Sequence, residues 1–152
     1  MRVSAKADYA VRAVVELATV PGGEYLKAEE LAGRQEIPRH FLDNILTDLR
    51  RAGIVATLRG AEGGSRLARP ASEITIADIM RAIDGPLAAV RDVRPEKLSD
   101  EGAAASLPKL WIGVRASLRS VLECVTVADV VADRLPPSVE KLLEDPEAWL
   151  AH

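Results

Sequence analysis

The sequence predicts a mainly α-helical fold with a small β-hairpin wing, followed by a long helix suited to dimerisation. Three observations support this fold class. Apolar residues recur at helical spacing in the first third of the chain. A glycine-rich segment at 60–64 separates two short runs that resemble strands. Near the other end, apolar residues repeat at spacings of three and four, which is the pattern of paired helices.

Length and composition restrict the class of protein. The 152 residues suffice for one domain with a hydrophobic core, or for a small domain that carries an oligomerisation arm. Aromatic residues make up only 3%, so alanine, valine and leucine are expected to form the core. No apolar run reaches the roughly 18 residues of a membrane span, and charges interrupt the N-terminus where a signal peptide would be apolar. We therefore expect a cytoplasmic protein without membrane contact.

The first three helices are expected at about 5–19, 28–35 and 38–52, with a tight turn before Pro38. The third helix has two different faces. Its apolar face consists of Phe41, Leu42, Ile45, Leu46 and Leu49. Its opposite face carries polar side chains at i, i+4, i+7 and i+11, namely His40, Asn44, Thr47 and Arg51. Two short helices joined by a turn, the second with such a polar face, are typical of a helix-turn-helix.

A β-hairpin is expected directly after the third helix, with strands at 54–58 and 65–68. Residues 50–69 contain five arginines and one acidic residue, although the whole chain has a net charge of -3. A narrow glycine-rich tip with Arg59 and Arg66 at its base is suited to the minor groove of DNA, where arginine is favoured. The alternative is a structural hairpin whose arginines are simply solvated.

The rest of the chain is predicted to contain a helix capped by Thr75 and stopped at Gly85, an irregular loop at 86–106, and a long helix that Ser106 caps. The long helix presents a seam at spacings of 3, 4, 3 and 4, formed by Trp111, Val114, Leu118, Val121 and Val125. We predict that this seam is the interface of a homodimer. The alternative is that the seam packs on its own domain.

A short helix after Thr126 completes the regular part, and Pro136-Pro137 is expected to end it, with a last acidic helix in the tail as the alternative. The predicted organisation therefore has four parts, which are a winged helix-turn-helix DNA-binding domain at 1–85, a loop at 86–106, the dimerisation helix with the short helix at 107–135, and a C-terminal tail at 136–152.

Several blocks of the sequence resemble the Rrf2 family of bacterial transcription regulators. These blocks are "SAKADYAVRAVVELA" at 4–18, "IPRHFLDNIL" at 37–46, "RGAEGGSRLARP" at 59–70 and "EITIADIMRAIDGP" at 73–86. The stretch from Trp111 to Val130 is similar to the dimer helix and the following short helix of that family. The resemblance extends over about 130 residues in the same order, and the RG..GG pattern of the wing is specific.

The resemblance implies a winged helix-turn-helix homodimer that represses transcription by binding a pseudo-palindromic operator in double-stranded DNA. It implies that His40, Asp43 and Asn44 face base edges and that Arg59 reads the minor groove. The side-chain chemistry agrees, because asparagine pairs with adenine, aspartate accepts from the cytosine amino group and histidine donates to guanine. The expected phosphate and wing contacts, which set the register without reading sequence, are Arg39, Thr47, Arg51, Gly60 and Arg66.

The chain departs from the family at one place. Many Rrf2 members hold an iron-sulfur cluster through three cysteines in the loop that corresponds to about 86–108, and this loop contains no cysteine here. The lone Cys124 cannot form such a site by itself. We therefore expect no iron-sulfur cluster, no other cofactor and no metal site. Cys124 is expected to be a small buried apolar residue, with a thiol switch as the alternative.

The sequence contains no motif that favours catalysis over DNA binding. The only histidines are His40 and His152, and no catalytic triad or metal-ligand spacing is present. The GAEGG segment at 60–64 lacks the Gly-Lys-Ser/Thr of a phosphate-binding loop. We predict that the chain is not an enzyme. Two modes of regulation stay open, which are binding of a partner protein such as a metabolic enzyme and binding of a small molecule between 86–106 and the dimer helix.

Overall fold

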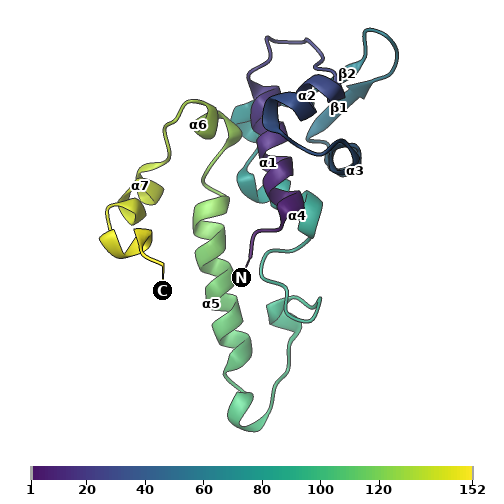
Figure 1. The fold of residues 1–152 in the computed structure, drawn as a ribbon. Helices are drawn as coiled ribbons and strands as arrows, with labels where there is room; N and C mark the ends of the chain where they lie inside the picture. The colour runs from purple at the N-terminus through teal and green to yellow at the C-terminus, as the bar shows by residue number, and fades with distance from the viewer. Residues whose placement is uncertain (1, 152) are drawn as a thin grey trace.

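The computed structural model describes residues 2–151. Its first half is a compact unit of helices with a two-stranded antiparallel hairpin (Figure 1). The elements of this unit are α1 (Ala5–Ala18), α2 (Ala28–Gln35), α3 (Arg39–Arg51), β1 (Val55–Leu58), β2 (Gly64–Leu67), the 3-10 turn η1 (Ala71–Glu73) and α4 (Ile76–Asp84). This mainly helical architecture with one hairpin confirms the predicted fold class.

The helices begin and end where local chemistry predicts. The Ser4 hydroxyl accepts from the backbone N–H of Ala7 at 3.0 Å, so Ser4 caps α1. Pro38 precedes the first residue of α3 with φ -57°, which suits a helix start because no amide hydrogen is needed there. Thr75 and Asp78 bond reciprocally to each other's backbone N–H groups and form the expected capping box of α4.

A single hydrophobic core joins these elements. Leu42, Ile45, Leu46 and Leu49 bury the inner face of α3, as the periodicity predicts. Phe41 was assigned to the same face, and this assignment is wrong. Its side chain is 36% exposed, and its ring lies at the surface between the rings of Tyr9 and His40 (centroid distances 5.7 and 4.5 Å). Each helical residue turns by about 100°, so Phe41 falls at the edge of the apolar face.

The hairpin is anchored to the helices by a third extended segment. Leu26 and Ser65 exchange two backbone hydrogen bonds of 2.9 and 2.8 Å. This close approach explains one glycine of the turn, because a Cβ on Gly64 would lie 2.4 Å from the carbonyl oxygen of Leu26. At Gly63 a Cβ would lie 2.2 Å from the carbonyl oxygen of Leu58. Both glycines are therefore required by the packing of the backbone.

The second half of the chain leaves the compact unit and returns to it (Figure 1). Residues 86–106 are irregular, as predicted, with two 3-10 turns, η2 (Pro95–Lys97) and η3 (Gly102–Ala104). They run beside α5 (Leu107–Leu122), which projects from the compact unit. The chain then comes back to α1 through α6 (Val127–Val131).

Two predictions about this half are wrong. The long helix ends at Leu122, so Val125 lies beyond it, and Val125 is buried in the chain's own packing at 6% exposure, where its carbonyl accepts from the backbone N–H of Ile76 at 3.0 Å. Pro136-Pro137 does not end the ordered part, because Pro137 occupies the first turn of α7 (Pro137–Leu143), a position that proline tolerates. A last 3-10 turn, η4, spans Pro146–Trp149. Among residues 2–151, no helix is both long and apolar enough to cross a membrane.

Candidate nucleic-acid interface

The outer face of α3 presents three neighbouring polar side chains to solvent. His40, Asp43 and Asn44 are all exposed, as predicted for residues that face a ligand. The amide of Asn44 donates to the carbonyl oxygen of His40 at 3.2 Å, and Asp43 pairs with Arg39 at 3.3 Å. Both interactions are local and solvent-exposed, so little energy opposes their exchange for contacts with a ligand.

The C-terminal half of the same face combines polar and cationic groups. The hydroxyl of Thr47 donates to the carbonyl oxygen of Asp43 at 2.9 Å, and the Arg51 side chain is 75% exposed. Asp48 accepts from the Lys6 ammonium of α1 at 2.7 Å. Lys6 therefore borders the shallow depression that contains Asn44, Thr47 and Arg51. The place of Lys6 beside this face was not predicted, because Lys6 lies 42 residues from Asp48 and no local pattern links the two.

The wing tip is joined to the start of α3 by a groove. Arg59 follows β1 directly and is exposed, as is Gly60 at the turn. Arg39 and Gly60 line the same groove, together with Lys27 at the start of α2. The structure therefore brings together two predicted contacts, Arg39 and Gly60, that are 21 positions apart in the chain. Lys27 was not predicted, because its place beside Arg39 and Gly60 depends on how the segments pack.

Arg66 is placed differently from Arg59. Its guanidinium lies over the ring of Tyr25 at 4.7 Å and donates to the carbonyl oxygen of Gly23 at 3.2 Å. Such a cation–π contact and hydrogen bond hold the loop between α1 and α2 against β2. The prediction grouped Arg66 with Arg59 at the base of the tip, but its charged group is engaged inside the chain.

The arrangement has the dimensions and charge of a surface for a polyanion. The 13 residues of α3 form a rod of about 20 Å, and the exposed wing lies at its side (Figure 1). The exposed cations of this surface are Lys27, Arg39, Arg50, Arg51 and Arg59. Asp43, Glu29 and Glu62 are exposed nearby, so the excess of positive charge is modest. A helix with free hydrogen-bonding groups suits the major groove, and a narrow basic hairpin suits the minor groove.

The predicted dimer seam faces the chain's own loop in part. Trp111, Val114, Leu118 and Val121 are half-buried, and Leu118 lines a pocket with Met80 of α4 and Leu87 of the loop. The exposed residues of α5 include Leu110 at 53% and Ile112 at 39%.

The residues present do not fit an iron-sulfur cluster. Cys124 is half-buried, and its thiol donates to the carbonyl oxygen of Val121 at 3.2 Å. Within the described part of the chain, no three side chains of His, Cys, Asp or Glu lie close enough to hold a metal ion. A cluster of that kind requires several thiolate ligands.

Known proteins similar to this chain are transcriptional regulators. The HTH-type transcriptional regulator Rv1287 of Mycobacterium tuberculosis is 52% identical over 145 residues, which cover 95% of this chain and 90% of that protein. The HTH-type regulator CymR of Bacillus subtilis is 33% identical over 132 residues, or 87% of this chain and 91% of that one. The solved structure of CymR, the global cysteine regulator of B. subtilis, matches with a TM-score of 0.72 and 31% identity, over 87% of this chain and 97% of CymR.

A second solved structure, IscR of T. potens, matches with a TM-score of 0.66 and 29% identity, over 100% of this chain and 93% of that one. The family model described as the Rrf2 iron-dependent transcriptional regulator matches residues 3–133. These relatives are regulators, which confirms the prediction that the chain is not an enzyme. The chain belongs to the Rrf2 family of transcriptional regulators.

Proposed function

We propose that the protein is a homodimeric repressor that binds a pseudo-palindromic operator in double-stranded DNA, and that it acts in the cytoplasm. The observation that carries this proposal is the juxtaposition of the exposed polar face of α3 with the exposed Arg59 at the wing tip, across the groove that Arg39 and Gly60 share. Membership of a regulator family supports it.

In the proposed complex, α3 lies in the major groove and the wing lies over the adjacent minor groove. His40, Asp43 and Asn44 contact base edges, and Arg59 enters the minor groove. Arg39, Thr47, Arg51 and the backbone of Gly60 contact phosphates and set the register. Arg66 is left out of this set, because Tyr25 and Gly23 already engage its guanidinium.

We propose that α5 forms the dimer through its outward face. This helix has no fully buried residue in one chain, and its exposed side carries the small residues Gly113 and Ala116, with Leu110 and Ile112 at its two edges. Small residues allow two helices to approach closely, and a two-fold axis would repeat α3 on two half-sites of one operator. The half-buried seam residues Trp111, Val114, Leu118 and Val121 then border this interface instead of forming its centre.

The first experiment is the selection of bound fragments from the source genome by the purified protein, followed by binding curves for the enriched fragments. Arg59→Ala is expected to weaken specific binding by about 1 to 3 kcal/mol, whereas Arg91→Ala, the same charge change on the exposed 86–106 loop, should leave it unchanged. Affinity should fall with salt at a log-log slope of about -0.9 per neutralised phosphate. Equal affinities of Arg59→Ala and wild type would remove Arg59 from the readout.

The dimer is tested by sedimentation at micromolar protein. Wild type is expected to sediment as a dimer, and Ile112→Glu as a monomer, because the variant would bury a charge at the interface. Glu144→Gln, a change in the exposed tail, is the control. A monomeric wild type would contradict the assignment of α5.

A further inference from the structure

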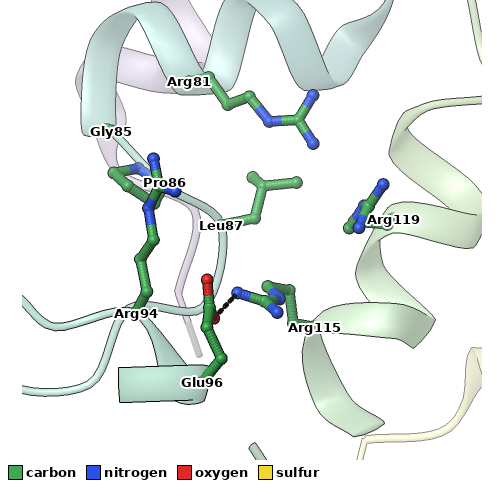
Figure 2. Close-up of a pocket in the computed structure, with 8 residues that line it drawn as sticks. All are labelled: Arg81, Gly85, Pro86, Leu87, Arg94, Glu96, Arg115 and Arg119. Carbon is green, nitrogen blue, oxygen red and sulfur yellow. Dashed lines mark hydrogen bonds and ion pairs between the residues drawn. The ribbon is translucent and has the colours of Figure 1, made fainter. Parts of the chain in front are cut away.

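A cavity of about 430 Å³ lies between the C-terminal end of α4, residues 85–96 and α5 (Figure 2). Its lining side chains come from three segments and are mostly cationic or apolar, namely Arg81, Gly85, Pro86, Leu87, Arg94, Glu96, Arg115 and Arg119.

The four arginines of this cavity outnumber the carboxylates that neutralise them. Glu96 pairs with Arg115, and Glu123 receives both Arg81 and Arg119, the latter at 2.9 Å. Four positive charges thus meet two negative ones. Hydrogen bonds with Arg119 and then Arg81 lower the pKa of Glu123, so it stays ionised at neutral pH and the net charge of the cavity is +2.

Arg94 is the arginine of this cavity that no direct hydrogen bond or ion pair holds, although its charge helps to lower the pKa of Glu96 after the larger effects of the Glu96 backbone and Arg115. Within residues 2–151, its guanidinium makes no hydrogen bond and no ion pair that would neutralise it, and Figure 2 shows it beside Pro86 at the edge of the cavity. The neighbouring Arg91, by contrast, pairs with Asp100 at 3.4 Å outside the cavity. Leu87 forms an apolar wall at 8% exposure.

A guanidinium presents two parallel N–H donors that match the two oxygens of a carboxylate or a phosphate. Converging guanidinium groups with an excess of charge are therefore complementary to a ligand with more than one anionic group. A cavity of this volume is in the range of small-molecule sites. The hydrogen-bond donors of the cavity are guanidinium groups, whose positive charge repels a metal ion.

We infer that this cavity binds a small metabolite with two or more carboxylate or phosphate groups, and that this metabolite is the effector of the regulator. The anion bridges Arg94 of the loop and Arg81 of α4 to Arg115 and Arg119 of α5. Since α4 packs on α1 and α3, the bridge couples the position of α5, and with it the spacing of the two α3 helices in a dimer, to occupancy of the cavity. The regulatory part of this inference rests on the proposed DNA binding, whereas the binding part does not.

Calorimetric titration with citrate and with pyrophosphate, at constant ionic strength, tests the binding part on the full chain. Wild type is expected to bind at least one of them with a Kd below about 1 mM, and to bind acetate at least about tenfold more weakly, because acetate offers one anionic group. Arg94→Gln, which breaks no hydrogen bond or ion pair, should weaken binding about fivefold or more, and Arg94→Gln with Arg119→Gln about tenfold or more. Arg91→Gln is the matched control and should bind as wild type does.

Two results would overturn the binding part. One is the absence of binding of both probes to folded wild type, and the other is equal affinity of wild type and Arg94→Gln. Melting curves verify that the double variant is folded, and the single variant serves if it is not.

Operator binding is then measured with and without the probe that binds. The probe should change wild-type affinity for DNA at least about fivefold and leave Arg94→Gln unchanged, a coupling of ordinary size. Arg94→Gln without the probe should bind DNA as wild type does, and a loss would reassign these arginines to DNA and overturn the inference. Anion binding without any specific DNA binding would refute the proposed function alone, and DNA binding without anion binding would refute this inference alone.

Discussion

The helical unit at 5–84 and the arm at 86–122 both contain apolar helices, but they differ in how far these helices are buried within one chain. In the unit, α1, α2, α3 and α4 share one core with the hairpin. In the arm, the 16 residues of α5 form an equally regular helix that contains no fully buried residue. The comparison teaches that an apolar repeat is enough to form a helix, whereas burial of that helix depends on what the rest of the fold places beside it.

The segment after α5 sharpens this comparison, because it returns to the first region. Val127 of α6 is completely buried in the core of the helical unit. Thr126 forms a bridge with Thr75, and each of these threonines begins a helix with the same capping box, using Asp129 and Asp78 respectively. Both ends of the arm therefore connect to the helical unit, and α5 between them is covered on one side only.

The largest difference between the regions is expected for leucine truncation. Leu42→Ala in α3 should lower the free energy of unfolding by about 2 to 5 kcal/mol, since the side chain is completely buried and leaves a cavity. Leu110→Ala in α5 should change it by less than about 0.5 kcal/mol at a protein concentration at which the proposed dimer has dissociated, because this side chain is exposed in one chain. Urea unfolding at low, fixed protein concentration measures both. Similar losses would mean that Leu110 is covered in solution.

Glycine replacements should have opposite signs in the two regions. Gly64→Ala is expected to cost about 1 to 3 kcal/mol, because its Cβ would lie 2.4 Å from the carbonyl oxygen of Leu26. Gly113→Ala is expected to stabilise one chain by about 0.5 to 1 kcal/mol, since alanine favours the helix and no atom lies within 4 Å. Thermal unfolding of both variants gives the comparison. If Gly113→Ala destabilises the protein, this side of α5 is packed closely in solution.

The two capping boxes allow a smaller and more symmetrical comparison. Thr75→Ala and Thr126→Ala should each lower stability by about 1 kcal/mol, because each removes a hydroxyl that accepts from a helix N-terminal N–H. Thr→Ser at the same positions keeps the acceptor and should restore most of the loss in chemical denaturation. A neutral Thr126→Ala would show that α6 contributes little to the core, against the burial of Val127.

The smallest effect is expected from an ion pair between α1 and α2, and it should depend on pH. A hydrogen bond from Arg34 lowers the pKa of Glu16, and Gln35 adds to this while partial burial opposes it. Since the folded pKa lies below the unfolded one, the contribution to stability is present above the unfolded pKa and is lost as the pH falls through the folded value. Glu16→Gln should therefore lower stability by less than about 1 kcal/mol at pH 7.

Thermal melts at neutral and acidic pH measure this effect. The difference between Glu16→Gln and wild type should disappear in acid, where wild-type Glu16 is protonated. Glu24→Gln, an exposed glutamate in the loop before α2, is the control and should show no such dependence. A difference that persists in acid would assign the effect to packing and not to charge.

Much of this fold was predictable because its determinants are local. The caps at Ser4, Thr75 and Thr126 are short-range hydrogen bonds between neighbours in sequence. The polar face of α3 was predictable for the same reason, since a period of 3.6 residues decides which side chains share a face. The glycine-rich wing was predictable from its turn residues, although the steric demand of Leu26 on Gly64 was not.

The errors arose where the orientation of whole elements decides the outcome. Phe41 was expected in the core and lies at the surface, and Val125 was expected at a dimer interface and lies buried in its own chain. The contact of Arg66 with Tyr25 was likewise not indicated by the sequence. In each case the partner is distant in sequence, and no periodicity encodes which of several available surfaces a side chain meets.

The sequence by itself determined the order and type of the elements, the two faces of α3 and the family, because these depend on residue spacing, capping and turn chemistry. Only the tertiary structure decided which arginines are engaged within the chain and which stay available. Arg66 is held by Tyr25 and Gly23, Arg59 is exposed, and Arg81, Arg94, Arg115 and Arg119 converge on one cavity from three segments. The physical reason is that a charge acts through distance in space, and packing sets that distance independently of separation along the chain.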